Sequence, residues 1–371
     1  MNDHLHIVCL DAPAPPDYGG AIDMYYKIVS LAELGKQIIL HYFNYNPSRN
    51  IGALDSYCKE IYSYPRKRKN ITIKKPYIVT SRVNAQLIKR LSEDSFPVIL
   101  EGIHCTGTLP ALVNNERKIV VRVHNDEAKY YNRLAKAEKN LLKKSYYAIE
   151  SKLLNQYQFK LSQEAVYACL SKTDEVIFRQ KYSLPVVQFL PCFVPWQHIR
   201  IKGDKGTFCL YHGKMSVSEN EETAKWLIEN VFSSLSVSFI IAGSGISAHL
   251  KRFAAPFSNI QLINNPTIVE MDELIRNAQI NVLPSLNNTG VKLKLLHALF
   301  DGRFCVTNKA GVSGSGLESL VELAESSAET KEIILKFFDQ PFTKEHQQPR
   351  QLLMQLYDNK KNAELLNEWL S

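Results

Sequence analysis

The stretch PSLNNTGVKLKLLHALFDG, residues 284–302, decides the fold of this chain. It follows a short apolar run and predicts a small-residue loop leading into a helix, because its leucines and alanine recur at helical spacing. Asn287, Asn288 and Thr289 are residue types that cap helices, and Gly290 lets a backbone pass close to a bound group. A buried strand, a small-residue loop and a helix in succession are typical of a parallel α/β sheet.

Two lysines, Lys292 and Lys294, fall in the first turns of this predicted helix. A helix start carries unpaired backbone N–H groups and a partial positive charge. The lysines therefore predict a site for a phosphate or another anion. The alternative interpretation is an ordinary strand-to-helix connection with two surface lysines.

Length and composition indicate a soluble globular protein of two domains, since 371 residues exceed one typical core. No apolar run approaches the ~20 residues that cross a bilayer, and the N-terminus lacks the basic lead of a signal peptide, so we expect a cytoplasmic protein. The seven scattered cysteines and ten histidines show no disulfide framework and no metal-ligand spacing. The net charge of +8 is concentrated in residues 1–200, where 28 basic residues face 18 acidic ones, and this predicts an anionic partner there.

The first half of the chain begins as a doubly wound sheet, with a strand at 7–10, a helix at 22–32 and a strand at 37–43. The connecting loop DAPAPPDYGG ends in Gly19 and Gly20, which would allow a ligand to approach or simply form a tight turn. A dinucleotide fingerprint is absent. A later strand, 119–123, places His124 at its carboxyl end, where doubly wound sheets hold their ligands, and a long helical region is expected over 125–163.

A basic segment, residues 65–76, interrupts the first half with cations around two isoleucines. A solvated loop is the plain interpretation of such a run. Contact with anionic lipid headgroups is the functional one, and no nucleic-acid-binding motif accompanies the segment. The cations are Arg66, Lys67, Arg68, Lys69, Lys74 and Lys75.

The second half repeats the same pattern and predicts a second doubly wound sheet. Lys214 follows its first strand, 208–212, and a GSG loop beginning at Gly243 follows the next strand. We expect domains at 1–192 and 193–346. The apolar residues of 347–371 predict a C-terminal helix that crosses back to the N-terminal domain.

These motifs, in this order, resemble the GT-B glycosyltransferases, and most closely the retaining GT4-like group. DYGGAIDMYYKIVSLAELG resembles that family's N-terminal loop and helix, and VVRVHN resembles its strand with a sugar-contacting histidine. YHGKMS is similar to its first C-domain strand with a phosphate-binding cation, and GVKLKLLHALFDGRFCVTN resembles its donor segment. The resemblance implies two Rossmann-like domains facing a central cleft.

The resemblance also implies roles for individual residues. His124 would bond a sugar hydroxyl or the developing charge, and Lys214 would neutralise the diphosphate leaving group without a metal. The donor would be a nucleoside-diphosphate sugar, with UDP and GDP both open, and no further cofactor is expected. The expected donor-binding residues are Gly19, Gly20, Gly243, Asn288, Thr289, Gly290, Val291, Lys292 and Lys294.

Two departures from the family stand out. Its paired glutamates would fall on Thr289 and His297, and the basic residue expected shortly after Lys214 is missing, unless Lys292 or Lys294 replaces it.

The leading prediction is an enzyme that transfers a sugar to a glycan or lipid-linked acceptor in surface polysaccharide assembly, with retention, at the inner membrane face. A catalytically degenerate GT-B protein that binds glycan or serves as a scaffold is the alternative. A GT-B epimerase or phosphorylase is not favoured, because neither a cofactor lysine motif nor an acidic catalytic set is evident.

Overall fold

The computed structural model describes residues 3–46, 48–67, 74–113 and 117–371. The chain divides into two compact units. The N-terminal unit consists of Met1–Pro195 together with Tyr357–Ser371, and the C-terminal unit is Trp196–Leu356. The segment expected to act as one C-terminal helix therefore divides at Tyr357, and only its second part lies in the N-terminal unit.

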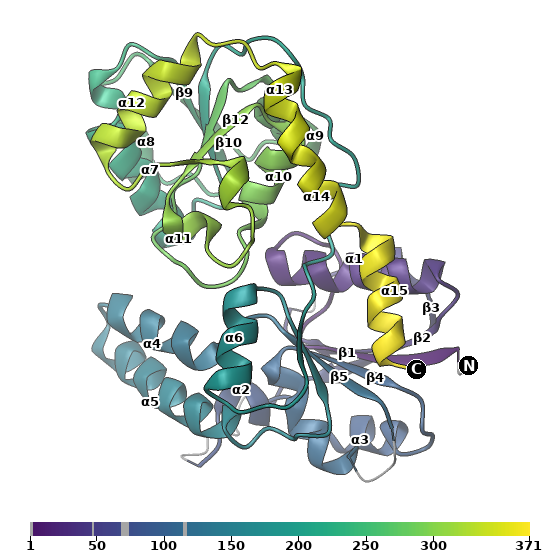
Figure 1. Cartoon of the computed structure of the whole chain (residues 1–371). Coiled ribbons are helices and arrows are strands. Elements are labelled where there is room, and N and C mark those ends of the chain that lie inside the picture. The colour runs from purple at the N-terminus through teal and green to yellow at the C-terminus, as the bar shows by residue number, and fades with distance from the viewer. Residues whose placement is uncertain (1–2, 47, 68–73, 114–116) are drawn as a thin grey trace. The chain divides into compact units, whose positions relative to one another are not determined.

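The described residues of the N-terminal unit form a seven-stranded parallel sheet in the order β3-β2-β1-β4-β5-β6-β7 (Figure 1). This order reverses direction between β1 and β4, which is the signature of a doubly wound sheet. The fold class expected from the sequence is confirmed. The strands are β1 (His4–Cys9), β2 (Gln37–Asn44), β3 (Cys58–Pro65), β4 (Val98–Glu101), β5 (Ile119–Val123), β6 (Val166–Cys169) and β7 (Val187–Phe189).

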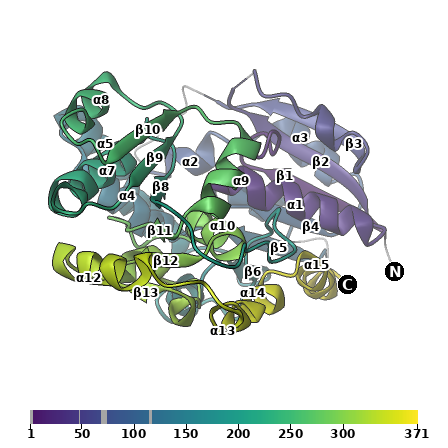
Figure 2. The same ribbon diagram turned by 90° about the horizontal axis from the view of Figure 1, so that it is seen from above.

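Helices cover both faces of this sheet, as the view in Figure 2 also shows. Apolar residues of α1 and α15 form one core with the sheet, and α2, α3, α5 and α6 contribute to the core on the other face. The helical segments are α1 (Gly19–Glu33), η1 (Gly52–Leu54), α2 (Tyr77–Thr80), α3 (Ala85–Leu91), η2 (Ile103–Ala111), α4 (Glu127–Ala137), α5 (Leu141–Gln158), α6 (Lys172–Gln180) and α15 (Asn359–Trp369).

The long helical region expected over 125–163 is instead a hairpin of two helices, α4 and α5. Asp126 caps α4 by accepting from the Lys129 N–H, and Asn140 caps α5 by accepting from the Leu142 and Lys143 N–H groups. Asparagine competes well for helix N-termini, so Asn140 starts a new helix inside a continuous helical pattern.

The last helix, α15, packs against α1. Its first residue, Asn359, forms two hydrogen bonds with the backbone of Val194: its side-chain oxygen accepts from the N–H at 3.0 Å, and its amide donates to the carbonyl at 2.8 Å. Ala363, Leu366 and Leu370 complete the core on this face of the sheet.

The C-terminal unit has a six-stranded parallel sheet in the order β10-β9-β8-β11-β12-β13, with the reversal between β8 and β11. The helical pattern beyond residue 347 is partly in this unit, as α14. The strands are β8 (Cys209–His212), β9 (Phe239–Gly243), β10 (Ile260–Asn264), β11 (Ile280–Val282), β12 (Phe304–Thr307) and β13 (Glu322–Leu323). The helical segments are α7 (Ser218–Asn230), η3 (Phe232–Ser234), α8 (Ala248–Ala254), α9 (Ile268–Asn277), α10 (Leu293–Asp301), α11 (Lys309–Val312), η4 (Glu318–Leu320), α12 (Ser327–Phe338), α13 (Lys344–Gln347), η5 (Gln348–Arg350) and α14 (Gln351–Leu356).

Candidate active site

Each sheet brings predicted residues to the carboxyl ends of its central strands, where doubly wound folds bind ligands. In the N-terminal unit, α1 begins at Gly19, close behind β1, and His124 directly follows β5. In the C-terminal unit, Lys214 follows β8, and the loop 284–292 follows β11.

His124 and Gly20 lie side by side. A β-carbon built on Gly20 would stand 3.7 Å from His124 Nδ1 and 3.1 Å from the Tyr18 ring. Tyr18 is the N-cap residue of α1, and its side chain makes no capping bond, so the helix start is open toward this region. The structure therefore brings together Gly19, Gly20 and His124, which the sequence predicted from separate motifs.

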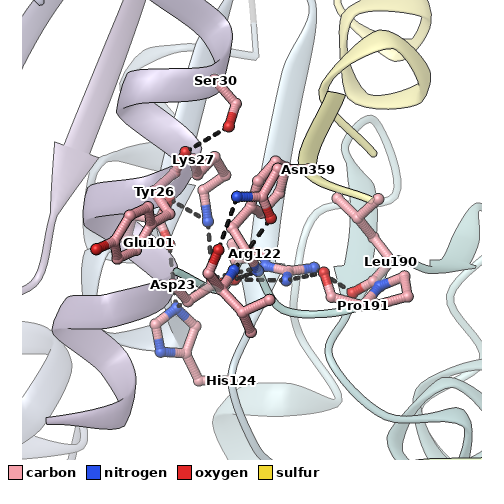
Figure 3. Close-up of polar contacts among 12 residues, drawn as sticks. Asp23, Tyr26, Lys27, Ser30, Glu101, Arg122, His124, Leu190, Pro191 and Asn359 are labelled. Atoms are coloured by element: carbon pink, nitrogen blue, oxygen red, sulfur yellow. Dashed lines mark hydrogen bonds and ion pairs between the residues drawn. The ribbon is translucent and has the colours of Figure 1, made fainter. Parts of the chain in front are cut away.

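A network of buried charges stands behind His124 (Figure 3). His124 Nε2 donates to Glu101 Oε2 at 3.0 Å, and the other Glu101 oxygen lies 2.8 Å from Lys27 Nζ. Lys27 also pairs with Asp23 at 2.8 Å, and Asp23 receives two hydrogen bonds from Arg122, of 2.9 and 3.0 Å. The two acids and two cations compensate one another, so the network fixes the imidazole without requiring it to be charged.

Arg122 extends the same network to the end of the N-terminal sheet. Its guanidinium donates to the carbonyls of Leu190 and Pro191 at 2.6 and 2.9 Å, and the Phe193 N–H donates to Asp23 at 2.8 Å (Figure 3). Strands β4 and β5, helix α1 and the segment that leaves the sheet are thereby joined. Sequence reasoning missed this network, because residues 99 positions apart in the chain, Asp23 and Arg122, carry no local signal of their pairing.

The electrostatics keep both acids of the network ionised. Burial alone would raise the pKa of Asp23, but the charges of Arg122 and Lys27 outweigh it and hold the pKa well below its usual range. Burial likewise opposes ionisation of Glu101, and Lys27 and the bond from His124 lower the pKa nonetheless. A third carboxyl behaves in the opposite way: burial raises the pKa of Glu127, at the start of α4, to about 8.

In the C-terminal unit, the ends of β8 and β9 approach closely. A β-carbon on Gly243 would fall 1.7 Å from the Gly213 carbonyl oxygen, so this position requires glycine for packing. The Met215 N–H also donates to the Ser244 carbonyl at 2.8 Å. Lys214 projects from this turn and is exposed, and no carboxylate in the described part of the chain forms an ion pair with its ammonium.

The loop 284–292 is organised by its own polar side chains. Asn287 Oδ1 accepts from the Thr289 N–H at 2.8 Å and from the Thr289 hydroxyl at 2.6 Å, and Lys292 Nζ donates to the Thr289 carbonyl at 2.7 Å. Gly290 has a φ of 64°, which favours glycine. Helix α10 begins only at Leu293, with Lys292 as its N-cap residue and no side-chain cap. The expected capping role of Asn287, Asn288 and Thr289 is therefore wrong, because these residues build the loop.

Lys294 turns into the unit instead of toward solvent. Its Nζ lies 3.4 Å from the Tyr211 hydroxyl and 3.3 Å from Asn220 Oδ1, and burial lowers its pKa to about 8. Asn220 in turn donates to the Lys214 carbonyl at 3.0 Å. Asn220 thus connects Lys294 to the turn that carries Lys214, which places both predicted cations at one edge of the sheet.

His297, which stands where the resemblance places one of the family's paired glutamates, forms a second ionic cluster. Its Nε2 lies 3.1 Å from Asp272 and 3.4 Å from Asp301, and its ring stacks on Trp196 with centroids 4.5 Å apart. Arg200 pairs with both acids, donating from Nε to Asp301 at 3.0 Å. Burial opposes protonation of His297, but the bonds to Asp272 and Asp301 prevail and raise its pKa. Sequence reasoning missed all four partners.

His212, the last residue of β8, points into the same region. Its ring stands edge-on to His297 with centroids 6.3 Å apart, and burial lowers its pKa well below the usual value. Its Nε2 is buried and has no hydrogen-bond partner among the described residues. It was not singled out from the sequence, although its place at a strand end is equivalent to that of His124.

Two groups have the geometry of a possible cation site: Asp23 with Glu101 and His124, and Asp272 with His297 and Asp301. In the first group, Lys27 and Arg122 already neutralise the carboxylates. In the second, Arg200 pairs with both acids, and His297, whose pKa is raised, supplies the second cation. The carboxylates of both groups are therefore engaged by cations of the protein itself.

The basic segment of the N-terminal unit lies partly outside the described residues, which exclude Arg68 and Lys69. Arg66 is held between two tyrosine rings, those of Tyr45 and Tyr77, at 4.9 and 5.0 Å from the ring centroids. The remaining cations, Lys67, Lys74 and Lys75, are exposed. In the described ranges, no helix combines the length and the apolar character that crossing a membrane demands.

Comparison with known proteins places this architecture in a class. The chain superposes over its whole length on a TarM variant from S. aureus solved with UDP, with a TM-score of 0.67 and 11% identity, covering 100% of each chain. It also superposes on HepE of Anabaena, solved with UDP and glucose, with a TM-score of 0.64 and 11% identity. The match covers 98% of this chain and 98% of HepE. The protein therefore has the GT-B fold of glycosyltransferases.

Similarity in sequence points to one family within the GT-B glycosyltransferases. Residues 206–336 match the family described as Glycosyl transferases group 1, which confirms the resemblance drawn from the motifs. A relative from Klebsiella pneumoniae, described as an uncharacterized 44.6 kDa protein in the cps region, is 27% identical over 335 residues, or 84% of each chain. The fold and the family match together support a glycosyltransferase.

Proposed function

We propose that the protein transfers a sugar from a nucleoside-diphosphate sugar to a glycan or lipid-linked acceptor, with retention, in surface polysaccharide assembly. The observation that carries the proposal is the exposed Lys214 at the reversal point of a sheet that matches the group 1 glycosyltransferases. Departure of a nucleoside diphosphate develops negative charge, and a fixed cation at that point stabilises it. The location of the relative in a cps region supports the polysaccharide pathway.

The proposed reaction needs no metal, because cations of the protein can meet the leaving group. Lys214 would contact the diphosphate, and the open N-terminus of α10 would add its partial positive charge. Gly20 and His124 would accommodate the transferred sugar in the N-terminal unit. Glycosyltransferases that bind UDP share this fold, so a UDP-sugar is the first donor to test.

The alternative, a degenerate GT-B protein that binds glycan without transfer, is favoured by one observation. The two positions of the family's glutamates are committed to internal contacts, Thr289 to Asn287 and His297 to Asp272 and Asp301. Neither residue can supply the carboxylate that the family has at these positions.

A panel of UDP- and GDP-sugars, titrated into the purified chain by calorimetry and followed for slow hydrolysis, separates these functions. We expect one donor to bind and hydrolyse, and Lys214→Ala to weaken both. Donor binding without hydrolysis would favour the degenerate protein. Transfer of the sugar to any polyprenyl-linked acceptor would favour the enzyme. Binding of no donor would contradict the proposed transfer and would favour the glycan-binding alternative.

A further inference from the structure

The α4–α5 hairpin of the N-terminal unit exposes large apolar side chains at its turn. Leu141 and Leu142 are 77% and 84% exposed, and Ile149, two turns further along α5, is 56% exposed. We call these three residues the apolar tip. At 100° per residue, Leu142 and Ile149 lie on one side of α5.

The apolar tip does not complete the core of its own unit. Helix α5 packs inward through Glu150, Leu154 and Gln158, which are all buried. Glu150 accepts from the Ile78 N–H at 2.8 Å, and this bond fixes the orientation of α5 against α2. The apolar tip therefore faces outward from the unit by construction, and its exposure needs an external explanation.

The hairpin that carries the apolar tip is rich in basic residues. Residues 129–152 contain seven basic and two acidic residues, and the acids are internally engaged: Glu150 as above, and Glu138 by accepting from the Asn140 N–H at 2.8 Å. No carboxylate of the described residues forms an ion pair with the exposed lysines of the hairpin. These are Lys136, Lys139, Lys143, Lys144 and Lys152.

Exposed leucines on a hairpin that also exposes several lysines complement an anionic bilayer surface: apolar side chains enter the acyl boundary while the cations meet the headgroups. We propose that the apolar tip and its lysines dock the protein on anionic membranes. This site is separate from the sugar-transfer machinery and does not depend on the proposed reaction. Lys74 and Lys75 are also exposed and precede α2, which α5 contacts through Glu150, so these two lysines can add charge without providing the insertion.

The C-terminal unit offers a matched control. Ile268 and Val269, at the start of α9, are 83% and 67% exposed, but Glu270, Asp272 and Glu273 follow them. This apolar pair is about as exposed as the apolar tip, but the side chains beside it are negative instead of positive. Anionic lipid should therefore repel this surface.

The experiment is co-sedimentation of the full chain with phosphatidylcholine vesicles that contain or lack about 30 mol% phosphatidylglycerol. We expect binding only to the anionic vesicles, reduced by about 0.5 M salt. Leu141→Ser with Leu142→Ser should weaken binding on the order of tenfold, and Lys143→Glu with Lys144→Glu on the order of a hundredfold. Ile268→Ser with Val269→Ser should leave it unchanged, and circular dichroism should show all variants folded.

Three results would overturn the proposal: no binding of the folded chain to anionic vesicles, binding that both hairpin variants retain, or equal loss in the α9 control. Sedimentation velocity adds a fourth. A dimer that dissociates on Leu141→Ser with Leu142→Ser would show that a second copy of the chain covers the apolar tip. Donor binding, measured on the same variants, should stay at the level of the unmodified chain, and a loss there would show that the hairpin acts on the proposed sugar-transfer site instead.

Discussion

The carboxyl edges of the two sheets both hold a histidine beside two carboxylates, but the charges around them are balanced differently. Around His124, Lys27 and Arg122 already neutralise Asp23 and Glu101. Around His297, Arg200 is the one guanidinium among the described residues that pairs with the two acids, so a protonated histidine completes the balance. The second histidine is held as part of a structural ion cluster, whereas the first lies beside Gly20.

Solvent exposure separates the clusters as clearly as charge. The side chains of Lys27, Asp23, Glu101 and Arg122 are all at most 1% exposed, whereas Arg200 is 43% exposed. A buried ion left without its partner costs far more than one that water can reach. The N-terminal cluster should accordingly be the more sensitive of the two to the loss of a cation.

The largest effect is expected from Lys27→Met, which leaves one buried carboxylate charge uncompensated. We expect a loss of about 3–5 kcal/mol of unfolding free energy for the N-terminal unit, measured by urea unfolding. Arg200→Met should cost less, because His297 still pairs with both Asp272 and Asp301 once the guanidinium is gone. Lys361→Met, at an exposed pair in α15, should change little. Equal losses from the first two variants would remove the distinction between the clusters.

Lys214→Ala tests the exposed cation of the C-terminal edge. Losing one preorganised charge at the leaving group should cost about 3 kcal/mol in the barrier, or on the order of a hundredfold in kcat. Donor binding should weaken as well, because the charge acts on the ground state too. Lys205→Ala, at an exposed pair with Asp339, is the matched control, and activity equal to this control would place the leaving group elsewhere.

His124→Ala should lower kcat about a hundredfold with little change in donor Kd, because this residue is proposed to meet the sugar and not the nucleotide. His124→Gln sharpens the test, since its amide can still donate to Glu101 and keep the network intact. If the histidine only held Glu101 in place, the glutamine variant would recover full turnover.

The smallest effect is the pH dependence contributed by His297. Its pKa is raised above the ordinary 6.5, so its stabilisation is complete below 6.5 and is lost as pH rises through the raised value. Each unit of raised pKa is worth about 1.4 kcal/mol. The free energies of unfolding of the unmodified chain and His297→Gln should therefore converge as pH rises from 6.5 through the raised value. A constant difference would mean that His297 is not charged in the folded protein.

Much of the fold followed from the sequence, because strands, helix caps and glycine turns depend on neighbouring residues. Strand β5 begins and ends where the pattern predicted, and the glycine–histidine pair of the N-terminal edge was found from two short motifs. The sheet order followed from repeated strand–helix units, since parallel crossovers permit few alternatives.

The tertiary structure decided what these residues do. Asp23 on α1 meets Arg122 on β5, and Asp272 on α9 meets His297 on α10, only because these elements pack together in the folded units. The sequence alone does not single out these acids. Lys294 illustrates the same limit: its helical position predicted an anion site, but packing against Tyr211 turned it inward. Local propensity is written in adjacent residues, whereas the partner of a buried charge is fixed by the sheet that brings the two together.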